Sequence, residues 1–334
     1  MMQDPKSVLV TGGAGFIGSH TCKQLQAKGY RPVTFDNLST GNRSAVQFGP
    51  FVHGDVRDAG AVAAAIRAHR VSAIIHFAAS AYVGESVADP ANYYDNNVGG
   101  MIGLLAAVRA TGIKNVVFSS SCATYGIPDT LPIRETTPQS PINPYGRTKL
   151  YGEEMLRDHD AAYGQRHVAL RYFNAAGADP DGILGEYHTP ETHLIPLALL
   201  AAAHRGPALN VLGTDYPTPD GTCIRDYIHV RDLARAHVLA LGYLQGGGAS
   251  TALNLGSGVG LSVRQVIAAI EKLTGEPMPV RFGPRRAGDP PVLTADPCRA
   301  AEVLGFRTEL SRIDTIIRHA APHFGVKVSH DVAA

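Results

Sequence analysis

The 334-residue sequence lacks the patterns that mark disulfide-bonded and metal-binding proteins. Its four cysteines are scattered along the chain without a Cys-x-x-Cys pair, so we predict neither a disulfide framework nor a cysteine metal site. Its 14 histidines form no His-Glu-x-x-His motif, in which one helix face presents two metal ligands. We therefore expect a cytoplasmic protein with reduced cysteines and no bound metal ion.

The sequence also lacks a charge excess and a long apolar run. Lys and Arg total 30 and Asp and Glu total 29, which argues against nucleic-acid or anionic-membrane partners. The longest apolar stretch, residues 194–203, contains Pro196 and is far shorter than the roughly 20 residues of a membrane span. The apolar run near the N-terminus is too short for a signal peptide. The balance of 45% hydrophobic and 18% charged residues is typical of a globular protein with a large core.

The N-terminal stretch has the pattern of a strand, a glycine turn and a helix. An apolar run at residues 7–11 is followed by Gly12, Gly15 and Gly18. Glycines at this spacing allow backbone N–H groups to approach a pyrophosphate at a helix N-terminus. The next strand ends at Asp36, 24 residues after Gly12, where a carboxylate can bind a ribose hydroxyl and would repel a 2′-phosphate. The pattern therefore predicts a dinucleotide site that favours NAD over NADP.

Apolar strands continue to alternate with helices as far as residue 172. This alternation predicts a Rossmann-like, doubly wound parallel sheet of the α/β class. The further strands are expected at residues 51–54, 73–77, 115–119 and 168–172, with helices near 58–70 and 90–110 and another from about 144. In such sheets ligands bind at the carboxyl ends of the strands. One crevice should therefore be lined by the residues that follow strand ends, which are Gly12, Asp36, Asp55, Ala78, Ser119 to Ser121, Phe173 and Asn174.

From about residue 175 the chain becomes richer in glycine, aspartate and proline, notably in loops at 178–190, 213–221 and 282–291. We predict a NAD-binding domain at 1–175 and a smaller α/β substrate-binding lobe at 176–334, with the chain crossing back at least once. Between the loops we expect helices near 193–205, 230–244, 262–274 and 310–322, and strands near 209–212, 252–255 and 279–282.

Tyr145 and Lys149 form a candidate catalytic pair. If a helix starts here, they lie one turn apart on the same face. A phenol has a pKa of about 10 and is a poor base at neutral pH. A cation about 4 Å away is worth roughly 4 kcal/mol at an effective dielectric near 20, so we expect Lys149 to lower the pKa of Tyr145. The alternative is an ordinary surface helix start, because Tyr-x-x-x-Lys is common by itself.

Further motifs make the sequence similar to a known family. From about residue 8 to 306 it resembles the extended short-chain dehydrogenase/reductases, and among them the UDP-glucose 4-epimerases. The general motifs are Thr-Gly-Gly-Ala-Gly-Phe-Ile-Gly at 11–18, His-Phe-Ala-Ala at 76–79, Ser-Ser-Ser at 119–121 and Arg-Tyr-Phe-Asn at 171–174. Two others are more specific to the epimerases: Asp-Gly-Thr-Cys-Ile-Arg-Asp-Tyr-Ile-His-Val at 220–230 and Arg-Arg-Ala-Gly-Asp at 285–289.

The resemblance implies a mechanism in which NAD stays bound throughout. Tyr145 takes the proton of the sugar 4-hydroxyl as C4 gives up a hydride, and both return after the 4-keto sugar has turned over. Lys149 would also reach the nicotinamide ribose, and Ser121 would steady or relay the proton, although a serine here could simply cap the strand end. Residues 121–126 carry no carboxylate, unlike related dehydratases and decarboxylases, which favours simple epimerisation.

The resemblance also implies the remaining contacts and a homodimer formed by the helices near 90–110 and 145–163. Arg225 and Arg286 would bind the diphosphate of a UDP-sugar, although solvated surface positions are the commoner fate of arginines, and Asp289 would bind a ribose hydroxyl. The predicted cofactor contacts are Gly12, Gly15, Phe16, Ile17, Gly18, Asp36, Asn37, Asp55, Val56, Phe77, Ala78, Ala79, Asn96, Ser119, Tyr145, Lys149 and Phe173. The predicted substrate contacts are Ser121, Asn174, His193, Leu194, Asn210, Val211, Leu212, Arg225, Arg286, Asp289 and Leu293.

Three positions depart from the family pattern. Ala81 stands where many relatives have a lysine that contacts the cofactor phosphates, and His193 stands where some have asparagine. Leu293 is intermediate between the tyrosine of strict UDP-glucose/UDP-galactose enzymes and the smaller residues of those that accept N-acetylated sugars. The expected substrate is thus UDP-glucose/UDP-galactose, with UDP-N-acetylglucosamine or a UDP-pentose as alternatives. A non-catalytic NAD-sensing module is a further alternative, although such proteins typically lose the tyrosine or the lysine.

Overall fold

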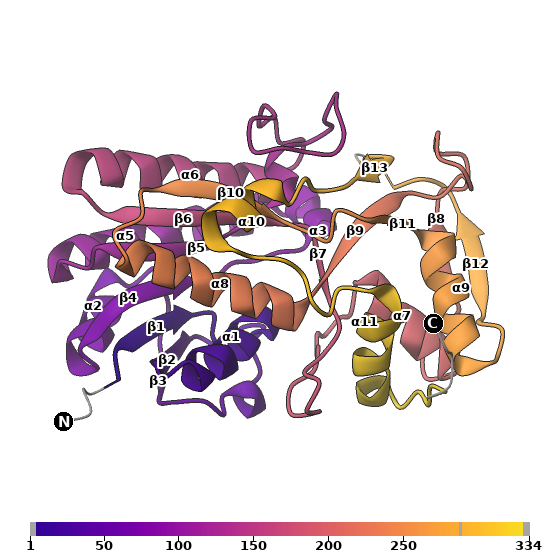
Figure 1. Cartoon of the computed structure of the whole chain (residues 1–334), viewed down its shortest axis with the longest axis horizontal. Helices are drawn as coiled ribbons and strands as arrows, with labels where there is room; N and C mark the ends of the chain where they lie inside the picture. The colour runs from indigo at the N-terminus through magenta and orange to yellow at the C-terminus, as the bar shows by residue number, and fades with distance from the viewer. Residues whose placement is uncertain (1–4, 287–288, 330–334) are drawn as a thin grey trace.

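The computed structural model describes residues 5–286 and 289–329, and its largest element is a seven-stranded parallel sheet (Figure 1). The strand order is β10-β6-β5-β4-β1-β2-β3, and every neighbouring pair is parallel. The predicted Rossmann-like α/β fold is confirmed. The strands are β1 (Ser7–Thr11), β2 (Arg31–Asp36), β3 (Phe51–His53), β4 (Val71–His76), β5 (Asn115–Ser121), β6 (Arg166–Tyr172) and β10 (Thr251–Leu255).

Both faces of this sheet are covered by helices, which explains why its strands are almost continuously apolar. On one face α1 packs beside α8, and α10 joins them over β10. On the other face α2, α5 and α6 bury a second core that includes Leu9, Phe35 and Ile74. These helices are α1 (Phe16–Ala27), α2 (Ala59–Ala68), α5 (Gly99–Thr111), α6 (Pro144–Tyr163), α8 (Val230–Gln245) and α10 (Cys298–Leu304).

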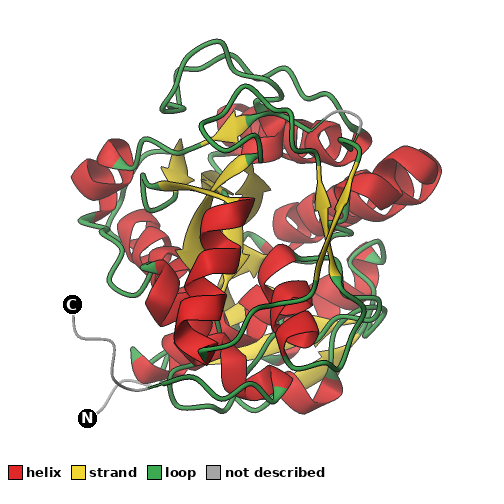
Figure 2. Cartoon of the chain, turned by 90° about the vertical axis from the view of Figure 1, so that its right-hand side faces the viewer, coloured by secondary structure: helices red, strands yellow, loops and turns green. Residues whose placement is uncertain are grey.

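A second lobe lies beyond the carboxyl ends of the large sheet, on the right of Figure 1. In it β9 pairs with β7, β11 and β13, and β8 pairs with β12. Helices α7, α9 and α11 bury a core of their own with residues such as Val211, Val266 and Ile316, and Figure 2 views this side face-on. The elements are β7 (Asn174–Ala176), α7 (Leu194–Ala202), β8 (Leu209–Leu212), β9 (Ile224–His229), β11 (Gly260–Ser262), α9 (Val263–Thr274), β12 (Val280–Gly283), β13 (Val292–Leu293) and α11 (Ile313–Ala320).

The chain moves between the two lobes more than once. After β9 it returns to the large sheet through α8 and β10, and later through α10. A domain boundary between residues 175 and 176 stays a prediction, and any such boundary has to assign α8 and β10 to the first lobe.

The helix expected near 90–110 differs from its prediction. It consists of α4 (Pro90–Tyr93), a π-helical turn η2 (Tyr94–Val98) and α5. The extra residue of a π-helical turn rotates the side chains that follow it. Here Asn97 accepts from the Ser80 backbone N–H at 2.8 Å and donates to Thr148 on α6 at 3.0 Å. Strand β9 and helix α3 (Val83–Ala88) were not predicted at all.

Within residues 5–286 and 289–329, no helix combines the length and the apolar character that a membrane crossing requires.

Candidate active site

A cleft of about 1060 Å³ lies between the carboxyl edge of the large sheet and the second lobe. Every site residue predicted from the sequence lines this cleft except Asp55. The carboxylate of Asp55 instead pairs with Arg57 at 2.7 Å and accepts from Asn37 Nδ2 at 3.1 Å. Asp55 therefore lies one layer behind the cleft wall, where it orients Asn37, which does line the cleft.

The glycine turn after β1 has no space for larger side chains. Gly12 has a φ of +71°, and a Cβ atom there would lie 2.5 Å from the backbone nitrogen of Ala78. A Cβ atom at Gly18 would lie 2.2 Å from the Gly12 carbonyl oxygen. Gly15 precedes α1, whose N-terminus no side chain of the described residues caps. Free N–H groups beside a shallow backbone surface fit a pyrophosphate.

Asp36 is held at the end of β2 by two backbone donors. Its Oδ2 accepts from the Ala14 N–H at 3.0 Å and its Oδ1 from the Leu38 N–H at 2.8 Å. Burial raises the pKa of this carboxyl group, and the two backbone hydrogen bonds oppose that shift. A fixed acceptor here fits a ribose diol and excludes a 2′-phosphate.

Tyr145 and Lys149 lie on the first turns of α6, as predicted. Asn143 caps this helix by accepting from the Gly146 N–H at 2.8 Å, and Pro144 occupies its first turn, where its fixed φ suits a helix start. Both side chains are buried, and Lys149 Nζ donates to the Ser119 carbonyl at 2.7 Å.

The predicted lowering of the Tyr145 pKa is wrong for this arrangement. Burial raises the pKa of Tyr145 to about 12, and a hydrogen bond with Ser121 acts in the opposite direction. Lys149 Nζ lies 5.8 Å from the Tyr145 ring centroid, and burial lowers its own pKa to about 7. Desolvation disfavours both charged forms, and it outweighs the attraction that the spacing in the sequence implied.

A buried ion pair fixes α6 to the sheet. Arg171 of β6 binds Glu153 of α6 through Nε at 2.9 Å and Nη2 at 2.5 Å. Arg171 also donates to the Tyr125 hydroxyl at 2.8 Å, and Ser120 donates to Glu153. Such a satisfied network fixes the orientation of the helix that carries Tyr145 and Lys149.

On the opposite wall, Asp289 is shared by two arginines. Arg225 projects from β9 and pairs with Asp289, whose second oxygen lies 3.2 Å from Arg286 Nη2. Arg225 and Asp289 are almost buried, whereas the side chain of Arg286 is 52% exposed. Two guanidinium groups and one carboxylate leave a net charge of +1 on this wall of the cleft, which suits an anionic ligand.

The other predicted substrate residues surround this group. Leu293 of β13 pairs with Arg225 of β9 and packs against the cluster that contains Cys122 and Phe173, next to Ser121. Leu194 begins α7 and Asn210 lies on β8, farther into the second lobe.

Some cleft residues were not assigned a role from the sequence. Tyr82 and Glu85 line the cleft, and the buried Tyr93 hydroxyl lies 2.8 Å from the Tyr82 carbonyl and 2.7 Å from Glu85 Oε2. The ring of Tyr93 meets that of Tyr145 edge-on, with centroids 6.5 Å apart. The spacing of these residues along the chain does not indicate that their side chains meet.

Comparison with known proteins identifies the family. The sequence profile of the NAD dependent epimerase/dehydratase family matches residues 8–256. The chain belongs to this family. It is 53% identical over 315 residues to a UDP-glucose 4-epimerase of Rhizobium leguminosarum bv. trifolii, covering 94% of this chain and 96% of that relative. It is 54% identical over 303 residues to the UDP-glucose 4-epimerase of Rhizobium meliloti (strain 1021), and this match covers 91% of this chain and 92% of that relative.

Solved structures of epimerase/dehydratase proteins agree with the fold. UDP-glucose 4-epimerase from Brucella ovis in complex with NAD superimposes with a TM-score of 0.95 at 62% identity, covering 97% of this chain and all of that one. A Stenotrophomonas maltophila UDP-glucose-4-epimerase with bound NAD and formylated UDP-arabinopyranose superimposes with a TM-score of 0.92 at 42% identity. The match covers 96% of this chain and 98% of that one. The family resemblance predicted from the sequence is confirmed.

Proposed function

We propose that this protein is a NAD-dependent UDP-glucose 4-epimerase that interconverts UDP-glucose and UDP-galactose. One observation carries the proposal: a single cleft joins the glycine turn and Asp36, the Tyr145–Ser121–Lys149 group, and the two arginines around Asp289. The names of the relatives, UDP-glucose 4-epimerases that match more than nine-tenths of the chain, support it.

NAD is the proposed cofactor. Asp36 would bind the adenosine ribose, the glycine turn and the start of α1 would bind the pyrophosphate, and Lys149 would bind the nicotinamide ribose. When bound, NAD supplies a reversible hydride acceptor at the sugar C4. The cleft volume of about 1060 Å³ is at the upper end of the usual range for ligand sites, as two nucleotide-sized molecules require.

Tyr145 is the proposed acid and base. Its phenolate takes the proton of the sugar 4-hydroxyl and the resulting phenol later returns it, and Ser121 donates a hydrogen bond to the same sugar oxygen. Because burial raises the pKa of Tyr145, forming the phenolate requires positive charge beyond that of Lys149, and the oxidised nicotinamide ring of bound NAD would add such a charge. Residues 121–126 carry no carboxylate that could move a second proton for elimination.

The sugar is the least determined part of the proposal. Leu293 lies beside Ser121 and Phe173, at the end of the cleft where the sugar would react. A leucine leaves more space there than a tyrosine would, which supports UDP-N-acetylglucosamine or a UDP-pentose as second substrates. A related structure from Campylobacter jejuni, described as a UDP-Glc/GlcNAc 4-epimerase, is 40% identical to this chain.

A substrate comparison without added cofactor tests the proposal. Purified protein is incubated separately with UDP-galactose, UDP-N-acetylgalactosamine and a UDP-pentose, and the products are separated by ion-exchange chromatography. We expect UDP-glucose from UDP-galactose with no net reduction of NAD. Bound NAD without turnover of any UDP-sugar would contradict epimerisation and favour a NAD-sensing module. A faster reaction with an acetylated or pentose substrate would shift the assignment to that sugar.

We further propose a homodimer formed through α5 and α6. These neighbouring helices expose large apolar side chains, among them Ile102 and Tyr151, which a second copy of the chain would cover. Sedimentation should give twice the chain mass, and Ile102→Glu should give the monomer. A monomeric wild-type protein would contradict this arrangement. The cytoplasmic location stays a prediction.

A further inference from the structure

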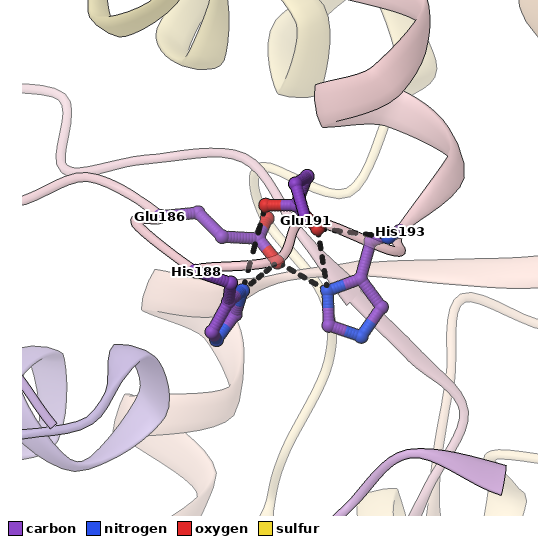
Figure 3. Close-up of side chains that lie close together, drawn as sticks. All are labelled: Glu186, His188, Glu191 and His193. Carbon is purple, nitrogen blue, oxygen red and sulfur yellow. Dashed lines mark hydrogen bonds and ion pairs between the residues drawn. The ribbon is translucent and has the colours of Figure 1, made fainter. Parts of the chain in front are cut away.

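The segment 186–193, which leads into α7, gathers two carboxylates and two imidazoles around one point (Figure 3). The residues are Glu186, His188, Glu191 and His193. One possible ligand atom from each lies within 4.8 Å of all the others. The sequence Glu-x-His-x-x-Glu-x-His lies in a loop and lacks the His-Glu-x-x-His spacing of the helical metal motif.

Three of the nitrogen-to-oxygen distances in the cluster are longer than good hydrogen bonds and close to the ligand spacing around a shared metal ion. His188 Nδ1 lies 3.4 Å from Glu186 Oε1 and 3.5 Å from Glu191 Oε2, and His193 Nδ1 lies 3.5 Å from Glu191 Oε1. Four ligands about 2.0–2.1 Å from a tetrahedral ion lie roughly 3.3–3.4 Å from one another. The fourth distance, 2.6 Å between His193 Nδ1 and Glu186 Oε1, is a hydrogen bond that would have to lengthen when an ion binds.

The burial of the cluster creates a need for positive charge. The carboxylates of Glu186 and Glu191 are 2% and 10% exposed, and no ion pair among residues 5–286 and 289–329 joins either of them to a lysine or an arginine. His188 Nδ1 is buried, points into the cluster, and makes no hydrogen bond with the described residues. Buried polar atoms normally have a partner, and a cation would provide one for His188 Nδ1 and offset the carboxylate charge. Glu191 Oε1 already accepts from the backbone N–H groups of Thr192 and His193 at 2.7 and 2.8 Å.

We propose that Glu186, His188, Glu191 and His193 bind a four-coordinate divalent transition-metal ion such as Zn²⁺. Imidazole nitrogens with carboxylate oxygens are common zinc ligands, and four protein ligands with no open position are typical of a structural site. A His193 bound to the ion would position the wall of the cleft, so this inference replaces the direct substrate contact predicted for His193. It does not depend on the proposed epimerase activity.

The ion would anchor the second lobe beside the cofactor wall of the cleft, which is the wall that the large sheet forms with residues such as Gly12, Asp36 and Lys149. His188 meets Phe16, the first residue of α1, edge-on with ring centroids 6.4 Å apart, and both His188 and His193 lie 6.0 Å from the ring of Tyr82. His193 directly precedes Leu194, the first residue of α7. Coordination would therefore fix the segment between α1 and α7 and hold α7 in place.

A metal-free network is the competing explanation. Burial lowers the pKa of His188, but the neighbouring carboxylates of Glu186 and Glu191 outweigh it and raise that pKa to about 9. A protonated His188 imidazole would then offset part of the carboxylate charge without an ion.

The test uses untagged, full-length protein, so that no affinity tag binds metal. The protein is equilibrated with Zn²⁺ and desalted, and its metal content is measured by mass spectrometry. We expect about one Zn²⁺ per chain, a higher melting temperature with Zn²⁺ than after chelation, and intense tetrahedral absorption bands when Co²⁺ replaces Zn²⁺. A wild-type chain that retains no metal and whose melting temperature Zn²⁺ does not change would overturn the proposal.

Variants separate this site from adventitious binding. Glu186→Gln and His188→Ala should lose the ion, whereas the exposed substitutions Glu154→Gln and His204→Asn should keep it. If those variants fail to fold, His188→Cys keeps the proposal testable, because a thiolate is also a zinc ligand. His188→Cys should retain the ion and add a sulfur-to-Co²⁺ charge-transfer band. Equal metal content in every variant, or Co²⁺ bands that His188→Cys leaves unchanged, would contradict the site.

Discussion

On the cofactor wall of the cleft the ligand-facing groups are buried and hydrogen-bonded to the backbone. On the substrate wall, which the second lobe forms with residues such as Arg225, Arg286 and Asp289, several of these groups are exposed. Asp36 and Lys149 are 7% and 4% exposed, and each is hydrogen-bonded to main-chain atoms. The side chains of His193 and Arg286 are 45% and 52% exposed and bind other side chains. The cofactor wall is thus organised before any ligand arrives, whereas on the substrate wall we expect the ion pairs of Asp289 with Arg225 and Arg286 to be exchanged for contacts with a ligand.

The difference has a structural cause. Strand ends of one parallel sheet carry the cofactor wall, and both faces of that sheet are packed. The substrate wall is built from short strands and from loops, where changes in sequence have the smallest cost in stability. We therefore expect cofactor binding to be sensitive to single changes and sugar specificity to be adjustable.

The largest effect is expected at Tyr145, where the two walls meet. Tyr145→Phe removes the proton acceptor and should lower kcat by about 10²–10⁴-fold. The fold should persist because the ring stays in place, which circular dichroism and bound-NAD absorbance would verify. Tyr163→Phe, whose exposed side chain lies at the far end of the same helix, is the matched control. An unchanged rate in Tyr145→Phe would contradict its assigned role.

Breaking the buried ion pair behind the cofactor wall should reduce stability strongly. Arg171→Met leaves the Glu153 carboxylate buried without its partner, which costs roughly 3–5 kcal/mol in free energy of unfolding. Urea denaturation measures this loss. Arg157→Met, which removes a solvent-exposed partner of Glu154 on the same helix, should change stability by less than about 1 kcal/mol. Equal effects in the two variants would show that burial does not distinguish them.

On the substrate wall, Arg225 and Arg286 should differ. Arg225→Ala removes a buried partner of Asp289 and should weaken UDP-sugar binding by about 2–5 kcal/mol. Arg286→Ala removes an exposed one and should cost only about 0.2–1 kcal/mol. Calorimetric titration with UDP measures both. A larger loss in Arg286→Ala would reverse the assignment of the main diphosphate contact.

Acid should destabilise the protein through buried histidines in the lobe that contains the large sheet. Burial lowers the pKa of His76 to about 3 and that of His237 to about 4, from about 6.5 in the unfolded chain. Because the unfolded chain binds the proton more readily, stability is complete above about pH 6.5 and falls as the pH drops toward 4.

Each such histidine contributes a slope of about 1.4 kcal/mol per pH unit in that window. His237→Gln should therefore reduce the pH dependence of the unfolding free energy by that amount, measured by urea denaturation across the window. A steeper slope in His237→Gln would contradict the neutral, buried state of this histidine.

The sequence was sufficient to predict the parallel sheet and the residues of the glycine turn and strand ends that line the cleft. Gly12, Gly18 and Asp36 follow from local spacing, because a strand, a turn and a helix N-terminus are contiguous in the chain. Sharing of Asp289 by Arg225 and Arg286 could not be predicted, since Arg225 and Asp289 are 64 residues apart. The raised pKa of Tyr145 could not be predicted either, because spacing along a helix indicates which charge lies nearby but not how deeply the side chain is buried.

The most direct test of the proposed chemistry is epimerisation in D₂O followed by proton NMR of the product. If C4 gives up and regains a hydride within the cleft, while Tyr145 handles only the hydroxyl proton, UDP-glucose formed from UDP-galactose should keep ordinary hydrogen at C4. Deuterium at C4 would mean that a base removes the carbon-bound hydrogen as a proton that exchanges with solvent, and it would contradict the account.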